Sequence, residues 1–354
     1  MSDTPNETQP AGGSGGDSGQ TKAKRKKQSG GTEGRLYATP EKIYPRKVQG
    51  FWRSVKLWSL VGLLAIYFIG PWIPWARPGA PDQAILLDLT NRRGYFFWIE
   101  IWPQEVYYLT GLLILAAIGL FLATALFGRI WCGFACPQTV WTDLFFYIER
   151  WIEGDRTKRM RMDRKPITDP EKLLRKSVKH LVWLLIGIYT AVNFVMYFDY
   201  APDVIPTLLD LGYGGGTWSM LALLTFTTYT LAGWAKEQVC IYMCPWPRFQ
   251  GAMLDEHSRI VTYEEWRGEP RGHAKPGQSF EGRGHCVDCH LCVQVCPTGT
   301  DIRNGTQLSC IGCALCIDAC DGVMDKFGLP RGLITYDSTF NQVAREKGEH
   351  EEVF

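Results

Sequence analysis

The feature of this chain that most constrains its fold is the stretch from Tyr107 to Phe127, which contains no charged residue. A bilayer core about 30 Å thick requires about 20 apolar residues in a helix, and this stretch is long enough. A buried helix of a soluble protein would carry a polar stripe, and Leu109 to Leu126 carries none. Three further apolar stretches resemble it. We therefore predict four membrane-spanning helices, at about residues 55–75, 107–127, 180–198 and 217–235.

The polar parts of the chain differ in charge. The 354 residues include 38 basic and 36 acidic side chains, so the overall charge gives no reason to expect nucleic-acid binding. Residues 1–38 are built largely from Gly, Ser, Thr, Gln and Lys and include a basic run at 22–27, which predicts a disordered basic tail near anionic lipid. The loop 129–179 has 12 basic residues and the loop 199–217 has none. The positive-inside rule then predicts that the 129–179 loop and both termini are cytoplasmic.

This topology puts all 12 cysteines on the cytoplasmic side or at its membrane edge. Cytoplasmic thiols stay reduced, whereas external thiols are expected to form disulfides. The distribution therefore indicates metal binding. We predict a membrane domain at residues 39–256, a cytoplasmic domain at 257–335 and a charged tail at 336–354.

Eight cysteines form a doubled run, Cys286-x2-Cys289-x2-Cys292-x3-Cys296 followed by Cys310-x2-Cys313-x2-Cys316-x3-Cys320. This is the bacterial ferredoxin spacing for two [4Fe–4S] clusters, in which the fourth cysteine of each run reaches the other cluster. We predict a small α+β ferredoxin domain with one cluster on Cys286, Cys289, Cys292 and Cys320 and the other on Cys310, Cys313, Cys316 and Cys296. Two zinc sites are the alternative, but zinc sites rarely show this interlocked triple spacing.

The other four cysteines form two matched motifs, Cys132-x3-Cys136-Pro137 and Cys240-x3-Cys244-Pro245, after the second and fourth predicted spans. In a helix, residues i and i+4 share a face, so each pair offers two thiolates to one site. The repeat predicts that both motifs meet at one membrane edge. Four thiolates there suit a soft metal, either Cu(I) or a further iron–sulfur centre. Buried thiols that act as small hydrophobes are the alternative.

Apolar residues also recur at helical spacing after Cys136, which predicts a helix lying on the membrane surface. These residues are Trp141, Leu144, Phe145, Ile148 and Ile152. His180 stands alone among the predicted spans, which argues against a bis-histidine haem. His285 and His290 flank the ferredoxin cysteines and are predicted to face solvent.

Five segments resemble the cytochrome c oxidase accessory protein family CcoG, also called FixG or RdxA. The resemblance covers about residues 35–335 and is carried by Leu36–Arg46, Ile101–Glu105, Gly128–Asp143, Glu237–Pro245 and Gly268–Gly272. It implies a multi-pass iron–sulfur protein of the bacterial inner membrane that acts with partners in assembling cbb3-type cytochrome oxidase. It further implies reduction of Cu(II) to Cu(I), with Cys132, Cys136, Cys240 and Cys244 as candidates for copper handling.

Typical members of that family continue into a fifth membrane helix and an external immunoglobulin-like domain, whereas this sequence ends at Phe354 after a charged segment. A four-span form also resembles NapH-type proteins, which take electrons from quinol. Three functions therefore stay open: a metal-reducing assembly factor, a quinol dehydrogenase subunit, and an assembly scaffold whose clusters only stabilise its fold.

Overall fold

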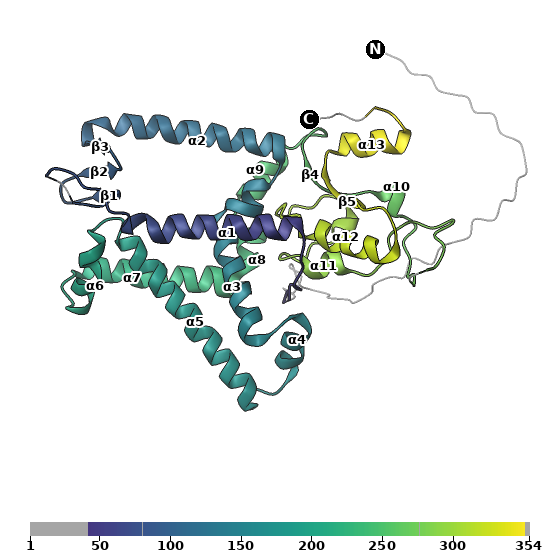
Figure 1. Cartoon of the computed structure of the whole chain (residues 1–354), viewed down its shortest axis with the longest axis horizontal. Coiled ribbons are helices and arrows are strands. Elements are labelled where there is room, and N and C mark those ends of the chain that lie inside the picture. The colour runs from purple at the N-terminus through teal and green to yellow at the C-terminus, as the bar shows by residue number, and fades with distance from the viewer. Residues whose placement is uncertain (1–41, 80, 276, 351–354) are drawn as a thin grey trace, which may run out of the picture. The chain divides into compact units, whose positions relative to one another are not determined.

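The computed structural model of this chain describes residues 42–79, 81–275 and 277–350 (Figure 1). The predicted tail at residues 1–38 lies outside the described residues. From Ile43 onward the chain forms one compact unit, so the apolar helices and the cysteine-rich part are in contact with one another.

Among the described residues, three helices are long and apolar enough to cross a membrane: α1 (Phe51–Ile69), α2 (Val106–Phe127) and α5 (Pro170–Val195). Helix α2 covers the predicted span 107–127, and Thr124 is its single buried residue. The hydroxyl of Thr124 donates to the Leu120 carbonyl at 2.9 Å, so the helix satisfies this polar group itself. An apolar helix with this much exposed surface requires apolar surroundings, which a bilayer provides.

Helix α5 begins at Pro170, ten residues before the predicted span at 180–198. Its first turns are polar, so the apolar pattern marks only the later part of the helix. Asp169 caps it, accepting a hydrogen bond from the Lys172 backbone at 3.0 Å, and Pro170 occupies the first helical position. The apolar part then packs along α7 (Gly215–Thr228), as Figure 1 shows. The two helices approach closely because Gly187 of α5 has no side chain; a Cβ there would lie 3.3 Å from the Thr225 carbonyl oxygen.

The predicted span at 217–235 is shared between α7 and the π-helical segment η4 (Tyr229–Ala235) that continues it. After η4 come α8 (Lys236–Gln238) and a second π-helical segment, η5 (Val239–Met243). The backbone changes direction at Lys236, which has a φ of 30°. This bend directly precedes the second Cys-x3-Cys motif.

Helix α3 (Pro137–Glu153) corrects one prediction. Its apolar face does not lie on the membrane surface. Phe145 and Ile148 are buried in a core with Trp183 of α5 and Ala232 of η4, while Val140 packs against α1. An amphipathic pattern requires an apolar contact but does not distinguish lipid from protein, and here protein supplies the contact.

The segment between the first two predicted spans forms a three-stranded antiparallel sheet of β1 (Ile85–Asp88), β2 (Arg93–Phe96) and β3 (Ile99–Ile101). In its register Ile85 pairs with Phe96 and Gly94 with Ile101. The buried Gln83 ties this sheet to the end of α5: its Nε2 donates to the Ile85 and Met196 carbonyls, both at 2.8 Å.

The cysteine-rich part is a small α+β unit. Strands β4 (Ile260–Tyr263) and β5 (Ile334–Asp337) pair antiparallel, and their core contains Met324 of α12 (Leu315–Phe327). Helix α11 (Leu291–Val295) packs beside α12 (Figure 1). The segment predicted as a charged tail contains the end of β5 and helix α13 (Thr339–Lys347). The remaining short elements are η1 (Gly70–Trp72), η2 (Pro103–Glu105), η3 (Trp131–Ala135), α4 (Arg156–Arg164), α6 (Ala201–Leu209), α9 (Trp246–Met253), α10 (Glu265–Gly268) and η6 (Ile302–Asn304).

This unit docks on the start of α1. The carboxylate of Asp318, in α12, accepts hydrogen bonds from the backbone amides of Trp52 and Arg53 at 3.1 and 2.7 Å. Free amides at a helix start favour a negative partner, so one contact both caps α1 and attaches the cysteine-rich unit to it.

Candidate iron–sulfur and thiol sites

The first thiol group consists of Cys286, Cys289, Cys292 and Cys320, as the spacing predicts. All four line one cavity beside Arg303 and Met324. Burial raises the pKa of the Cys320 thiol, and the neighbouring thiols of Cys292, Cys286 and Cys289 raise it further. A cavity lined by four thiols is a donor set that fits an iron–sulfur cluster.

The second thiol group consists of Cys296, Cys310, Cys313 and Cys316. Burial raises the pKa of Cys316 well above its usual range, and the thiols of Cys310, Cys313 and Cys296 add to the effect. Cys316 also interacts with Cys292 of the first thiol group, so the two groups are neighbours. That each group holds one cluster stays a prediction from the spacing.

The two thiol groups differ in exposure. Cys289 is exposed, whereas Cys313 is buried. The first thiol group therefore reaches solvent through Cys289, whereas no cysteine of the second group is exposed.

The membrane-edge thiols, Cys132, Cys136, Cys240 and Cys244, come from two segments with the same local structure. Cys132 lies in the π-helical segment η3 and Cys240 in η5. In each motif the last cysteine leaves the helix in an extended conformation. Its amide donates to the carbonyl five residues earlier at 2.8 Å, from Cys136 to Trp131 and from Cys244 to Val239. The predicted repeat is thus present in the backbone, with π-helical turns in place of α-helical ones.

The two motifs also lie near each other. Burial raises the pKa of Cys240 to about 12, and the thiols of Cys136, Cys132 and Cys244 contribute in the same direction. Cys132 donates from its Sγ to the Gln250 Oε1 at 3.3 Å. Within the described ranges, no three His, Cys, Asp or Glu side chains converge closely enough to hold a single metal ion. A cubane cluster does not need such convergence, because each cysteine binds a different iron.

Arg129 connects the membrane-edge thiols to the second thiol group. Its Nε donates to Gln250 Oε1 at 3.0 Å, so it supports the residue that contacts Cys132. Its Nη1 donates to the carbonyls of Leu308 and Cys310. Both Arg129 and Gln250 are buried. Sequence reasoning missed both: Arg129 carries a weak signal, a cation directly after an uncharged span, and Gln250 carries none.

The backbones of the two regions touch beside these side chains. A Cβ added to Gly133 would lie 3.0 Å from the Gly312 carbonyl oxygen and 3.1 Å from the Cys313 Cα. Cys132 and Cys240 also pack against the buried cluster that contains Cys313 and Ile311. The glycine between the two cysteines of the first motif therefore allows the membrane-edge thiols to approach the second thiol group.

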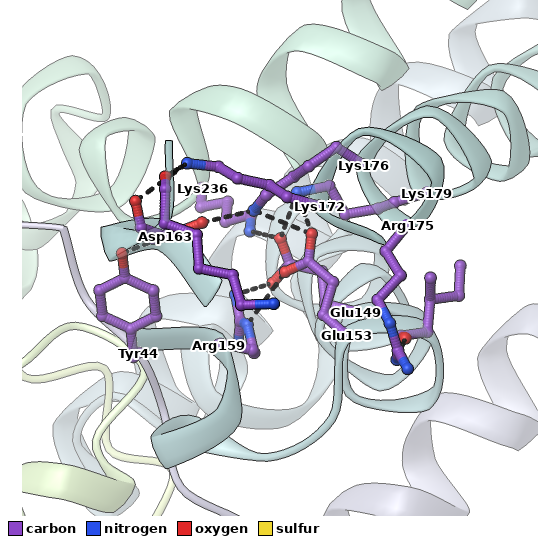
Figure 2. A network of polar contacts seen from close by, with 12 residues as sticks. Tyr44, Glu149, Glu153, Arg159, Asp163, Lys172, Arg175, Lys176, Lys179 and Lys236 are labelled. Carbon is purple, nitrogen blue, oxygen red and sulfur yellow. Dashed lines mark hydrogen bonds and ion pairs between the residues drawn. The ribbon is translucent and has the colours of Figure 1, made fainter. Parts of the chain in front are cut away.

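A buried charge network joins the segments next to the two Cys-x3-Cys motifs (Figure 2). Glu149 of α3 is 1% exposed and accepts from Lys236 at 2.6 Å and from Arg159 at 2.5 Å. Glu153 pairs with Lys176 and Lys179, both at 2.9 Å. The network links α3, which follows Cys136, to the bend at Lys236, which precedes Cys240. The network therefore keeps α3 close to the bend at Lys236, and so keeps the two motifs near each other.

The other predicted residues have local partners. His180 bonds to the Tyr229 hydroxyl at 3.0 Å. His285 accepts a hydrogen bond from Arg267 at 3.0 Å, and His290 bonds to Arg303 at 2.8 Å. His285 and His290 therefore contact arginine side chains near the first thiol group.

Comparison with known proteins agrees with this description of the site. A family model described as "4Fe-4S dicluster domain" matches residues 235–339, and one described as "4Fe-4S binding domain" matches residues 109–159. Together with the clustered thiols and the apolar helices, these matches define an iron–sulfur electron-transfer protein associated with a membrane.

Three curated relatives show the particular family. Protein RdxB of Cereibacter sphaeroides is 53% identical over 315 residues, covering 88% of this chain and 66% of its own length. Nitrogen fixation protein FixG of Rhizobium meliloti is 53% identical, with 86% and 58% covered, and Protein RdxA of C. sphaeroides is 50% identical, with 85% and 63% covered. The chain belongs to the FixG/RdxA family. It spans 58% to 66% of the length of these relatives. No solved structure matches it.

Proposed function

We propose that this protein moves electrons from two [4Fe–4S] clusters to a soft metal ion at the membrane edge, and that the ion is copper, reduced from Cu(II) to Cu(I). Cys286, Cys289, Cys292 and Cys320 hold one cluster, and Cys310, Cys313, Cys316 and Cys296 hold the other. The clusters supply one-electron transfer. In the proposed setting, the bacterial inner membrane, the reduced copper serves assembly of a cbb3-type oxidase.

The contact between Gly133 and the Gly312–Cys313 backbone carries this proposal. Electron transfer between centres slows steeply as their separation grows, so adjacency favours transfer between them. The exposed Cys289 offers an entry face on the first thiol group, and the second group lies against the membrane-edge thiols. The arrangement supports a path from solvent, through both clusters, to Cys132, Cys136, Cys240 and Cys244.

The membrane-edge thiols are suited to an ion that arrives and leaves. Thiolates stabilise Cu(I) over Cu(II), so they favour the reduced product. Each turnover takes one electron: Cu(II) becomes Cu(I) and one reduced cluster is oxidised.

The experiment compares the full chain with a Cys132→Ser/Cys240→Ser variant. Anaerobic, dithionite-reduced protein freed of excess reductant is mixed with Cu(II), and Cu(I) is trapped with a chromogenic chelator. We expect the wild type to produce Cu(I) and the variant to lose most of this activity while keeping about eight irons. Equal Cu(I) production by both proteins would contradict copper handling at these thiols.

A pocket favours quinol oxidation as a second candidate function. A cavity of about 230 Å³ opens between α1, α3, α5 and η4, lined by Tyr67, Gln138, Trp141 and Thr190. It also includes Pro137, the residue after Cys136, so an amphipathic ring bound there would lie beside a membrane-edge thiol. Reduction of the clusters by added quinol, without copper, would favour this function. Failure of quinol to reduce them would exclude it.

A further inference from the structure

A large cavity lies away from all the cysteines. It measures about 620 Å³, within the usual range of about 300–1,000 Å³ for small-molecule sites. The segment 47–50 and the start of α1 form one wall, and the end of α3 forms the other. None of its lining residues belongs to the three thiol sites.

The cavity is electropositive because Lys47, Arg53 and Arg150 face a single carboxylate of the lining, Asp155. Arg53 is neutralised from outside the cavity by Asp143, at 2.8 Å. Arg150 donates its Nε to the Phe146 carbonyl at 3.2 Å, and no carboxylate lies within ion-pair distance of it in the described part of the chain. Burial and the nearby charge of Arg53 lower the pKa of Arg150, while the charges of Asp143 and Asp155 act in the opposite direction. A partly buried cation without an ion-pair partner favours an anionic ligand.

The rim of the same cavity is apolar and faces outward. Tyr147 is 60% exposed, Trp151 79% and Leu57 42%. Leu57 belongs to α1, one of the three helices able to cross a membrane. Exposed Tyr and Trp beside such a helix are typical of the membrane–water interface. The ligand that fits therefore joins an anionic group to an apolar tail.

We propose that this cavity binds an anionic phospholipid, with the phosphate between Lys47 and Arg150 and the acyl chains along Leu57, Tyr147 and Trp151. Basic pockets at the cytoplasmic ends of membrane helices recognise anionic headgroups in this way. The bound lipid fixes the junction of α1 and α3. The same α1 turn is capped by Asp318 of α12, so the lipid site and the docking of the cysteine-rich unit share one helix end.

The test uses the full chain in detergent and measures phospholipids retained in native mass spectrometry after titration with phosphatidylglycerol or phosphatidylcholine. We expect one phosphatidylglycerol to bind in clear preference to phosphatidylcholine. The Lys47→Gln/Arg150→Gln variant should bind it roughly 30-fold more weakly, the usual contribution of two basic side chains at an anionic surface. The matched control, Lys158→Gln/Arg161→Gln, removes two exposed cations from α4 and should bind like the wild type.

Two further measurements separate a lipid from a simple anion. Inorganic phosphate should compete weakly, because it lacks the apolar tail. Trp151→Ser should weaken phosphatidylglycerol binding, while the iron content stays unchanged and shows that the variant folds. Full displacement of the lipid by millimolar phosphate, or equal affinity of the wild type and the Lys47/Arg150 variant, would overturn the proposal.

Discussion

The ferredoxin thiols and the membrane-edge thiols obtain their neighbours in different ways. Within the first and second thiol groups, three of the four cysteines come from one short segment, and only the fourth crosses over. The membrane-edge thiols come from two motifs separated along the chain by all the elements from α3 to α8. Short spacing fixes the first kind of site, whereas the second depends on how helices pack.

The two regions also differ in what surrounds the sulfur atoms. Cys313 lies in a buried cluster with Ile311 and Leu315, so the second thiol group is part of a hydrophobic core. Cys132 packs at the edge of the same cluster and also bonds to Gln250, which Arg129 holds in place. Loss of a ferredoxin thiol should therefore affect cofactor content and folding, and loss of a membrane-edge thiol should affect chemistry alone.

The largest difference should appear in iron content. Cys313→Ser removes a buried ligand of the second thiol group and should lower the iron from about eight to about four atoms per chain. Cys132→Ser should keep about eight. Iron analysis with EPR of the dithionite-reduced proteins measures both. Similar losses in the two variants would show that the membrane-edge thiols also hold iron.

The next largest effect concerns the charge network that holds the membrane-edge site. Glu149→Gln leaves Lys236 and Arg159 buried with less counter-charge, which should cost about 3–5 kcal/mol of stability. Thermal unfolding in detergent measures the change. The matched control is Glu171→Gln, which alters an exposed carboxylate and should leave the unfolding temperature unchanged. A stable Glu149→Gln protein would show that helix packing alone brings the two motifs together.

The contact between the regions should be sensitive to a single side chain. Gly133→Val places atoms against Gly312 and Cys313, so the membrane-edge thiols must move away. We expect transfer from reduced clusters to Cu(II) to slow roughly tenfold to a hundredfold at unchanged iron content. Gly119→Val is the control, because nothing lies within 4 Å of that position. Equal slowing in both variants would attribute the effect to the membrane helices in general.

The most gradual effect should be a pH dependence at Lys236. Burial lowers its pKa to about 8, from 10.5 in the unfolded chain. Between these values the unfolded state binds more protons than the folded state, so stability should rise with pH. Compared with Lys236→Met, the wild type should gain up to about 1.4 kcal/mol per pH unit between pH 8 and 10.5. Parallel pH profiles of the two proteins would contradict a lowered pKa.

These contrasts explain which features the sequence predicts. The uncharged run that defines α2 is compatible only with an apolar environment, so the bounds of this helix follow from the residues alone. The two ferredoxin groups follow from spacing for the same local reason. The amphipathic pattern of α3 predicts contact with lipid. That pattern does not reveal that Trp183 and Ala232 cover the apolar face instead. The π-helical turns around Cys132 and Cys240 and the bond from Arg129 to Gln250 depend on contacts between distant segments, which no local pattern encodes.

A single-turnover measurement tests the central claim most directly. Dithionite-reduced protein, freed of excess reductant, is mixed with two equivalents of Cu(II), one for each reduced cluster, frozen at intervals and followed by EPR. We predict that the reduced-cluster and Cu(II) signals disappear together in the wild type. Both signals should persist in the Cys132→Ser/Cys240→Ser variant. Loss of both signals at the same rate in the two proteins would contradict electron transfer through the membrane-edge thiols.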